Sequence, residues 1–562
     1  MFIRRKKAGE DRTKVQIVKS VRTGDKVRQR VLRHVGTAHG EEELERLEGV
    51  AEFILEELKA EDSGTAPLFT PKELADLTLR SRRAAENPEP FGVDVSECRH
   101  GGRVDAGIRE VFGGVYASMG WDRLFGARRM SANRIIKELT LARLAQPLSK
   151  RATVRELDTH GGLSLNLDYV YRSMDLIDDA VTEGIRKRSF EAARTLLPDP
   201  VSVIFYDTTT LYFESERGDG LREKGYSKDG RPHRVQTVFA LLVTPEGLPV
   251  GYELFPGDVY EGNTLIGALE RLERQYPGVS FTVVADAAMI SAANGAALRA
   301  RGTPYILGAR LRSRSAAERR LILDREGHTA LGDGPEDGSY RVIGTGDSRL
   351  VVTYSPRRAR KESRDRDRRI GKLRARLERN GSAAGQAGSG TARFLDFPGG
   401  RVTLNEDKIA EAARWDGLRG ITAWGLDDTG PLELLRIYRQ RAGIEACFRA
   451  NKHDLRIRPV FHWKPERIRA HIAICYMAYV CLQHLRHRLA ARGHPMSPDR
   501  IRRALGDMHY AILEQENGPG RFGLPSRASA DAGEIYRTLG MRWHTAAFII
   551  EPPEKTTTRR TA

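Results

Sequence analysis

The chain has 562 residues, 40% of them hydrophobic and 30% charged, which is enough for several domains with buried cores. Lysine and arginine total 93 against 75 aspartate and glutamate residues, a net charge of +18 that predicts a polyanionic partner such as nucleic acid. The 4 cysteines speak against a disulfide framework and indicate a reducing compartment. The most apolar run, residues 472–482, is shorter than the roughly 20 residues that span a bilayer, so we expect a cytoplasmic protein with no membrane partner.

The N-terminal third predicts a β-hairpin followed by helices. Residues 14–35 alternate apolar and polar side chains around a Thr-Gly-Asp turn, which is typical of a hairpin. A helical pattern over 41–58 completes a region that we assign to 1–95. The region 96–198 is mostly helical in period, and 128–145 combines an apolar face with a basic one. We interpret it as a DNA-binding helical region, although a solvated surface explains the basic face nearly as well.

At Val201 the sequence pattern changes from helical to strand-like, which indicates an α/β core over 199–311. Three strands are expected in succession, then a helix at 263–275, a strand, a helix at 291–302 and a last strand. This order is that of a mixed-sheet α/β fold. The expected strands are 201–207, 234–244, 247–255, 279–286 and 303–309.

Residues 312–425 interrupt this plan. Residues 357–379 carry twelve Lys or Arg and four acids, a pattern that favours a solvated helix or a disordered arm, with phosphate contact as the alternative. Residues 380–391 are of low complexity and predict a flexible loop, and a strand is expected at 417–424.

The core is expected to resume over 426–490, with a helix that begins at Pro431 and an apolar helix at 466–490. A C-terminal region, 491–562, ends in a tail that we expect to be disordered.

Two acids follow predicted strands. Asp207 ends the first strand and Asp286 ends the fourth, so their carboxylates can lie side by side at a sheet edge, where they would repel one another without a cation. Two divalent metals about 3.5–4 Å apart remove this repulsion and promote phosphodiester chemistry. Mg²⁺ suits such hard ligands. Singly, each acid is more often a turn former or a helix cap, so the prediction depends on their order in the chain.

A third acid lies in an unusual helical stripe. On a helix, at about 100° per residue, Arg441, Glu445 and Lys452 fall within roughly 60° of Tyr438. A face with a phenol, two cations and a carboxylate is not one that an apolar core would select. We therefore expect Glu445 to be the third metal ligand. The runner-up acids, Asp416, Asp427 and Asp428, precede this helix and lack its basic companions.

With these residues in place, the sequence resembles DDE transposases of bacterial insertion sequences, in the group with the Tyr-Arg-Glu-Lys signature. The fingerprint Y-x2-R-x3-E-x6-K is complete at 438–452, and the two Asp regions resemble the family as YDTTTLYFES (206–215) and VVADAAMIS (283–291). The likeness is strong over roughly 200–485. Two departures stand out: Ala287 and Ala288 occupy positions where a glycine is expected, and His233 stands where an acid is common.

The resemblance implies a ribonuclease-H-like catalytic core, split by a mainly β insertion domain at 312–425. It implies a transposase that cleaves phosphodiester bonds at the ends of a mobile element and joins the freed 3′-hydroxyl to target DNA. Asp207, Asp286 and Glu445 would bind Mg²⁺, with Mn²⁺ as a substitute, while Tyr438, Arg441 and Lys452 would bind DNA. Its partners would be double-stranded DNA and a second copy of the chain, at the nucleoid.

Several alternatives stay open at this point. The same core could belong to a metal-dependent nuclease or resolvase, or to a catalytically weakened DNA-binding derivative. Trp415, Trp424 and Trp463 are candidate platforms for a flipped base, although core packing is the commoner role of tryptophan. The last alternative is a zinc site formed by His471, Cys475, Cys481 and His484. The spacing of these residues is unusual for zinc, and core packing is the favoured interpretation.

Overall fold

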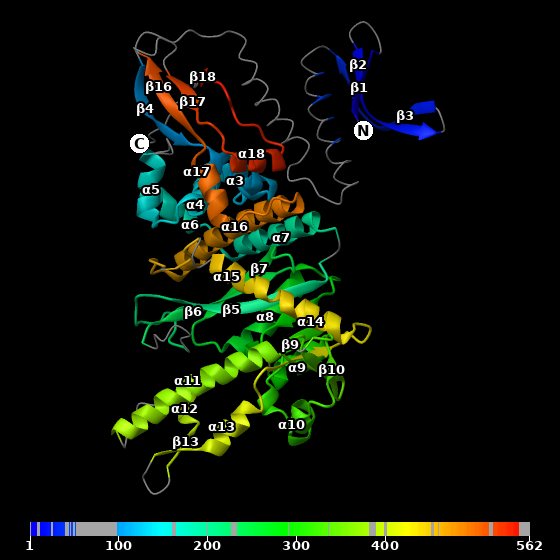
Figure 1. Ribbon diagram of the computed structural model, residues 1–562. Helices are drawn as coiled ribbons and strands as arrows, with labels where there is room; N and C mark the ends of the chain where they lie inside the picture. The colour runs from blue at the N-terminus through cyan, green and yellow to red at the C-terminus, as the bar shows by residue number, and fades with distance from the viewer. Residues whose placement is uncertain are drawn as a thin grey trace. The chain divides into compact units, whose positions relative to one another are not determined.

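The computed structural model describes most of the chain, in two compact units (Figure 1). One unit comprises residues 1–201, 208–259 and 443–562, and the other comprises 202–207 and 260–442. The described residues are 2–7, 12–23, 26–39, 44, 47–48, 51, 55, 98–159, 165–198, 201–225, 233–289, 291–334, 336–380, 389–397, 402–450, 455–458, 460–515 and 521–549.

The predicted N-terminal hairpin is confirmed. Strands β2 (Arg12–Thr23) and β3 (Lys26–His39) pair antiparallel along their whole length. A further strand, β1 (Phe2–Lys7), pairs with the other edge of β2. Val15 and Ile17 are buried with Ala51 in a small core of their own. The turn between β2 and β3 and most of the helix expected at 41–58 lie outside the described residues.

The rest of the first unit joins segments from both ends of the chain. Strand β4 (Cys98–Asp105) pairs with β16 (His509–Gln515) in a sheet of order β18-β17-β16-β4, where β17 is Arg521–Pro525 and β18 is Phe548–Ile549. The carboxylate of Glu110 accepts 2.8 Å hydrogen bonds from the hydroxyls of Tyr510 and Tyr536. The C-terminal region is therefore packed on the start of the helical region.

The helices of this unit include α16 (Pro465–Ala491), in which Tyr476 and Tyr479 are fully buried. Arg467 of α16 forms a two-pronged ion pair, at 2.7 and 2.8 Å, with Asp175. The other helices are α3 (Gly107–Ser118), α4 (Met130–Ala145), α5 (Lys150–Thr159), α6 (Leu167–Met174), α7 (Asp179–Leu196), α17 (Pro498–Gly506) and α18 (Ala530–Thr538).

The mixed α/β core has the predicted strands. They are β5 (Val203–Tyr212), β6 (Gln236–Val243), β7 (Pro249–Pro256), β8 (Thr282–Ala285) and β9 (Tyr305–Gly308). The end of β5 belongs to the first unit, where the strand order is β5-β6-β7 and β6 and β7 are antiparallel. The start of β5 belongs to the second unit, where β8 is parallel to both β5 and β9. The expected helices α8 (Thr264–Gln275) and α9 (Ala292–Ala300) are also present.

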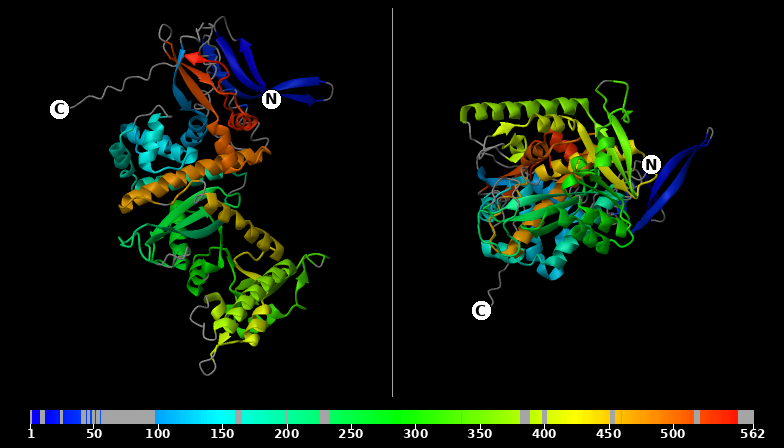
Figure 2. Two further views of the ribbon diagram at one scale, coloured as in Figure 1. Left: turned by 60° about the vertical axis from the view of Figure 1, so that its left-hand side comes forward. Right: turned by 90° about the horizontal axis from the view of Figure 1, so that it is seen from below.

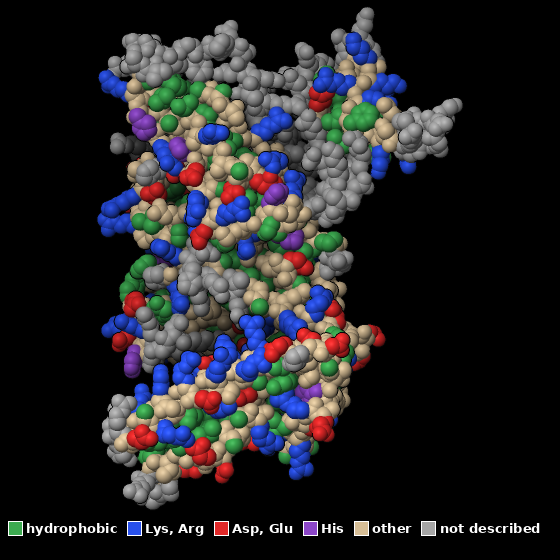
Figure 3. Space-filling model, in the orientation of Figure 1, with side chains coloured by type: hydrophobic (Ala, Val, Ile, Leu, Met, Phe, Trp, Pro, Cys, Tyr) green, Lys and Arg blue, Asp and Glu red, His purple; other side chains and the backbone are tan. Residues whose placement is uncertain are grey.

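The prediction of a mainly β insertion is wrong. The strands β10 (Thr329–Ala330), β11 (Ser339–Thr345), β12 (Ser348–Tyr354) and β15 (Leu418–Trp424) continue the core sheet beyond β9 in the order β10-β11-β12-β15-β9. The longest element of the insertion is a helix of 25 residues, α11 (Pro356–Asn380), which is straight in the right-hand view of Figure 2. It contains the charge run, whose Lys and Arg side chains gather along it in Figure 3.

The other elements of the insertion are α10 (Ala316–Leu323), α12 (Ser389–Ala392), α13 (Glu406–Ala413) and the two-stranded sheet of β13 (Leu395–Asp396) and β14 (Thr403–Leu404). Most of the low-complexity loop expected at 380–391 lies outside the described residues.

The signature segment forms two helices rather than one. Helix α14 (Pro431–Gln440) ends at Arg441, whose backbone N–H donates to the carbonyl of Tyr438 at 3.1 Å, and α15 (Ala442–Arg449) follows. A bond to the third preceding residue tightens the last turn of a helix. Tyr438 and Glu445 therefore belong to different helices, and Lys452 lies outside the described residues.

No helix among the described residues is long and apolar enough to cross a membrane.

Candidate active site

The two strand-ending acids lie in one row at the carboxyl edge of the sheet. Tyr206 of β5 pairs with Ala285 of β8. The residues that follow them, Asp207 and Asp286, are therefore level with each other on neighbouring parallel strands, which run about 4.8 Å apart. Gly308 is the third member of the row, because Ala285 also pairs with Leu307 of β9.

Both acids belong to the face of the sheet opposite α8. The Tyr206 hydroxyl donates to Thr264 Oγ1 at 2.7 Å, which fixes the side chain of Tyr206 on the side of α8. Since successive side chains of a strand point to opposite faces, Asp207 points away from α8. Asp286, level with it on a parallel strand, is on the same side.

The turn after Asp286 accommodates its alanines. Ala287–Met289 forms a 3-10 turn in which the N–H of Ala287 donates to Asp286 Oδ1 at 2.6 Å and the N–H of Met289 donates to the Asp286 carbonyl at 3.0 Å. Arg456 is the one non-glycine residue with positive φ in the described part of the chain. The backbone of Ala287 is therefore unstrained, and this position has no need of glycine.

Arg441 and Tyr438 extend the site from the end of α14. Arg441 Nη1 lies 3.7 Å from Asp286 Oδ2, and the Arg441 side chain is 17% exposed against 43% for Asp286. The guanidinium also lies 5.5 Å from the ring centre of Tyr438. Burial raises the pKa of the Tyr438 hydroxyl, and nearby Arg441 partly opposes this. Tyr438 therefore remains a hydrogen-bond donor at neutral pH, beside a cation that partly neutralises one acid.

Gly308 provides the space that Tyr438 occupies, a role that sequence reasoning missed. A Cβ at Gly308 would overlap the Tyr438 hydroxyl and lie 2.9 Å from the backbone nitrogen of Ala287. The only sequence signal was a glycine at the end of the last predicted core strand. Arg310, two residues later, was also missed, and its Nε donates to the Ala287 carbonyl at 3.1 Å.

Gly308→Ala should therefore lower activity by displacing both Tyr438 and the turn beside Asp286. A misplacement of about 1 Å at a reacting centre costs roughly a hundredfold in rate, and we expect a loss of that order in the DNA joining that the resemblance implies, measured with pre-cut ends. Gly344→Ala is a matched control, because Gly344 also lies in a strand and a Cβ there meets nothing within 4 Å. Equal joining rates for the Gly308 variant and the control would refute this role.

The remaining signature residues are only partly described. Glu445 belongs to α15 in the first unit, and its side chain lies outside the described part of the chain, as does the whole of Lys452. Among the described side chains, no group of three His, Cys, Asp or Glu is placed to hold a metal. This also removes the zinc reading, in which Cys475 and His471 are adjacent but no third ligand joins them.

The runner-up acid Asp416 has a structural role. It forms an ion pair with Arg366 of α11, with side-chain exposures of 15% and 12%, respectively. Asp427 and Asp428 are exposed in the turn before α14.

The tryptophans differ in environment. Trp415 is 6% exposed in the core of the insertion, which excludes it as a base platform. Trp424 stacks on Tyr305 with ring centres 6.1 Å apart. Trp463 is 68% exposed, with the guanidinium of Arg222 5.6 Å from its ring centre.

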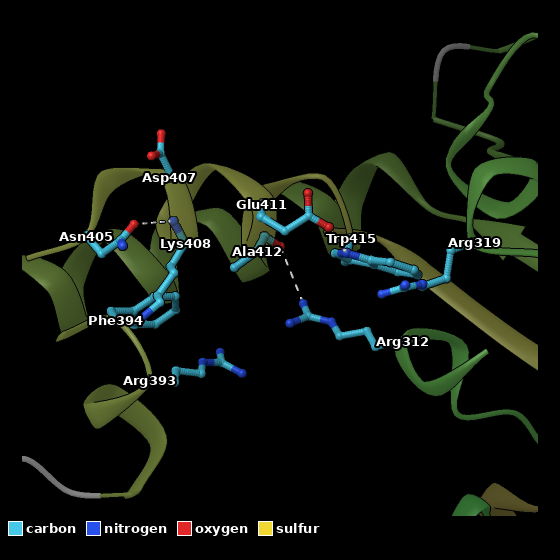
Figure 4. A pocket seen from close by; sticks show the side chains of 10 residues that line it. All are labelled: Arg312, Arg319, Arg393, Phe394, Asn405, Asp407, Lys408, Glu411, Ala412 and Trp415. Carbon is cyan, nitrogen blue, oxygen red and sulfur yellow. Dashed lines mark hydrogen bonds between the residues drawn. The ribbon is translucent and has the colours of Figure 1, made fainter. Parts of the chain in front are cut away.

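A pocket of about 480 Å³ lies in the insertion (Figure 4). It is not a second candidate for the catalytic site. Its acids include Glu411, which accepts a 3.1 Å hydrogen bond from Trp415 Nε1 and pairs with Arg414 at 2.9 Å. None of the predicted catalytic acids lines it. The lining residues are Arg312, Arg319, Arg393, Phe394, Asn405, Asp407, Lys408, Glu411, Ala412 and Trp415.

Comparisons with solved structures found transposases. A piggyBac transposase synaptic complex with hairpin DNA aligns with 71% of this chain and 76% of its own, at 10% identity and a TM-score of 0.39. A Mos1 transposase paired-end complex with the left transposon end covers 30% of this chain and 57% of that one, at 14% identity and a TM-score of 0.14. No curated protein matches the sequence.

Two family models match the chain itself. The model of the transposase DDE domain matches residues 199–481, half of the sequence, and includes both strand-ending acids and α14 with α15. The model of the N-terminal domain of IS1634 family transposases matches residues 2–65, which include the β1-β2-β3 sheet. The chain is therefore a DDE transposase of the bacterial insertion-sequence type.

Proposed function

We propose that this transposase cuts DNA at the ends of its element and joins the freed strands to target DNA at a site made by Asp207, Asp286 and Glu445. The observation that carries the proposal is the row in which Asp207 and Asp286 lie level on one face of the sheet, with Arg441 3.7 Å from Asp286. Two carboxylates at the same level of neighbouring strands are a donor set for a hard divalent cation. We infer that the three acids hold Mg²⁺, or Mn²⁺ in its place.

When bound, two such ions activate the attacking oxygen and stabilise the leaving oxygen of a phosphodiester exchange. The chain's own residues hold the reactants. Arg441 and Lys452 bind phosphate oxygens near the scissile bond through charge-assisted hydrogen bonds, and the Tyr438 hydroxyl donates another.

In the first reaction, water attacks a phosphodiester bond at the end of the element and releases a strand with a 3′-hydroxyl. In the second, that hydroxyl attacks a phosphodiester bond of target DNA, so that one bond forms as another breaks. Neither reaction needs a covalent protein–DNA intermediate.

The partners follow from this chemistry. The net charge of +18 suits double-stranded DNA, both at the element ends and at the target. We further propose that two copies of the chain act together, because two ends must be paired before joining, and that the protein works at the nucleoid in the cytoplasm.

The test supplies pre-cut element ends and a supercoiled plasmid to the purified protein, with Mg²⁺ or with EDTA. The proposal predicts joined products that depend on Mg²⁺. Cleavage without joining would instead establish a nuclease or resolvase, and end binding without either reaction would establish a non-catalytic derivative.

A further inference from the structure

One face of α11 is a continuous line of exposed cations. At about 100° and 1.5 Å per residue, five basic side chains fall within an arc of about 80° and extend over about 22 Å. We call this set the α11 basic stripe, and all of its members are exposed. The stripe consists of Arg357, Lys361, Arg364, Arg368 and Lys372.

The opposite face of α11 fixes the stripe in place. Ile370 and Leu373 are 7% and 5% exposed, and Ile370 packs with Phe394 and Ala412 in a core of the insertion. The helix is therefore held by its apolar side, and the basic stripe lies on its exposed side; Lys and Arg side chains gather along α11 in Figure 3.

Ion pairs occupy four arginines of α11 that lie outside the stripe. Away from the stripe, Arg358 pairs with Glu362 at 3.2 Å and Arg374 pairs with Glu406 at 2.7 Å. Arg360 and Arg366 likewise have acidic partners, Glu336 and Asp416.

Within the stripe, by contrast, the one ion pair recorded among the described residues joins Arg368 to Asp365 at the long distance of 3.9 Å. Four cations of the stripe thus form no ion pair in the described part of the chain, although Arg357 acts with Arg360, the stronger influence, to lower the pKa of the Glu336 carboxyl. An exposed row of like charges is destabilising unless an anion faces it.

We propose that the α11 basic stripe binds the phosphate backbone of duplex DNA without regard to base sequence. The proposal deepens the function proposed above and rests on it. A duplex presents one negative charge per about 1.7 Å of its axis, so a rigid line of five cations can meet several phosphates at once. Exposed arginine and lysine side chains make such contacts without reading bases. The insertion would thereby hold DNA at a surface separate from the acid row.

The salt dependence of DNA binding tests this directly. Each phosphate contact contributes about −0.9 to the slope of log K against log salt. The triple variant Arg357→Gln, Lys361→Gln, Arg364→Gln should therefore flatten the slope by about 3. Glutamine keeps the helix propensity, and thermal unfolding followed by circular dichroism verifies the fold. The matched control, Arg358→Gln, Arg360→Gln, Arg374→Gln, removes the same charge from arginines that already have acidic partners.

The proposal predicts a flatter slope for the stripe variant and a slope within about 1 of the wild type for the control. Equal flattening in both variants would mean that only net charge matters, and no flattening in the stripe variant would mean that the stripe does not touch DNA; either result overturns the inference. The joining activity of the wild type, measured in parallel, keeps the two proposals distinct. If the wild type joins DNA and the stripe variant has an unchanged slope, only the stripe proposal is refuted. A flattened slope without wild-type joining would instead refute the catalytic proposal while supporting the stripe.

Discussion

Asp207→Asn and Asp286→Asn should each lower strand joining by roughly a thousandfold or more, because stabilisation of transition-state charge by metal ions contributes several kcal/mol. Asparagine keeps the shape of the side chain but removes the negative charge that would attract the cation. Binding of element ends should stay within about twofold, since DNA affinity depends on cations elsewhere on the chain. The measurements are joining of pre-cut ends and a band-shift titration.

Asp427→Asn is the matched control, because Asp427 is exposed in the turn before α14 and lies outside the acid row. It should retain full activity. Strand joining by either row variant at a tenth of the wild-type rate or faster would show that the row is not the catalytic centre.

Lys150→Met should raise the free energy of unfolding near neutral pH by up to about 5 kcal/mol, the equivalent of the pKa shift of this lysine. Lys150 is 5% exposed, and its Nζ lies 3.5 Å from Nδ1 of His471. Burial, with a smaller contribution from nearby Arg143, lowers the pKa of Lys150 from 10.5 to about 7. Methionine fills a similar volume without a charge.

The pH dependence follows from the sign of this shift. The folded pKa is below the unfolded one, so between about pH 7 and 10.5 the unfolded chain binds the proton that the folded chain does not. Wild-type stability should therefore rise with pH across this window, and the methionine variant should lack that rise. His462 does not interfere, because burial lowers its pKa to about 4, and burial also lowers the pKa of His471 well below its usual value.

Thermal unfolding at pH 6.5, 8 and 9.5 measures both effects. Lys372→Met, an exposed lysine of α11, is the control and should follow the wild type. If Lys150→Met unfolds at the same temperature as the wild type throughout this range, folding does not lower the pKa of Lys150.

The acid row was predictable because its signals are local. Asp207 and Asp286 each follow a short run of apolar and β-branched residues, and such runs form buried strands wherever they lie in the chain. The order of strands and helices then placed both acids at the carboxyl edge of one sheet. The signature helix was also located, although its break at Arg441 was not, because the hydrophobic pattern does not record where the last turn of a helix tightens.

Other features depend on partners far away in the sequence. Lys150 reads as a solvated residue at the start of a helix, but its Nζ lies 3.5 Å from Nδ1 of His471, a residue of α16 that is 321 positions away in the sequence. Strand β4 pairs with β16 some four hundred residues later, and neither pattern alone identifies the other. The need for glycine at position 308 becomes evident only when Tyr438 is seen to lie against it. The family resemblance led us to expect a mainly β insertion, although the composition of its charge run is that of a helix.

Iron-directed cleavage tests the central claim, that Asp207, Asp286 and Glu445 surround one metal centre. Fe²⁺ replaces Mg²⁺ at carboxylate sites, and with ascorbate and peroxide it generates hydroxyl radicals that cut the nearest polypeptide. Fragments mapped by mass spectrometry should show cuts near residues 207, 286 and 445, all suppressed by excess Mg²⁺ and all lost together in Asp286→Asn. Cuts near 207 and 286 without any near 445, or cuts that persist in Asp286→Asn, would contradict it.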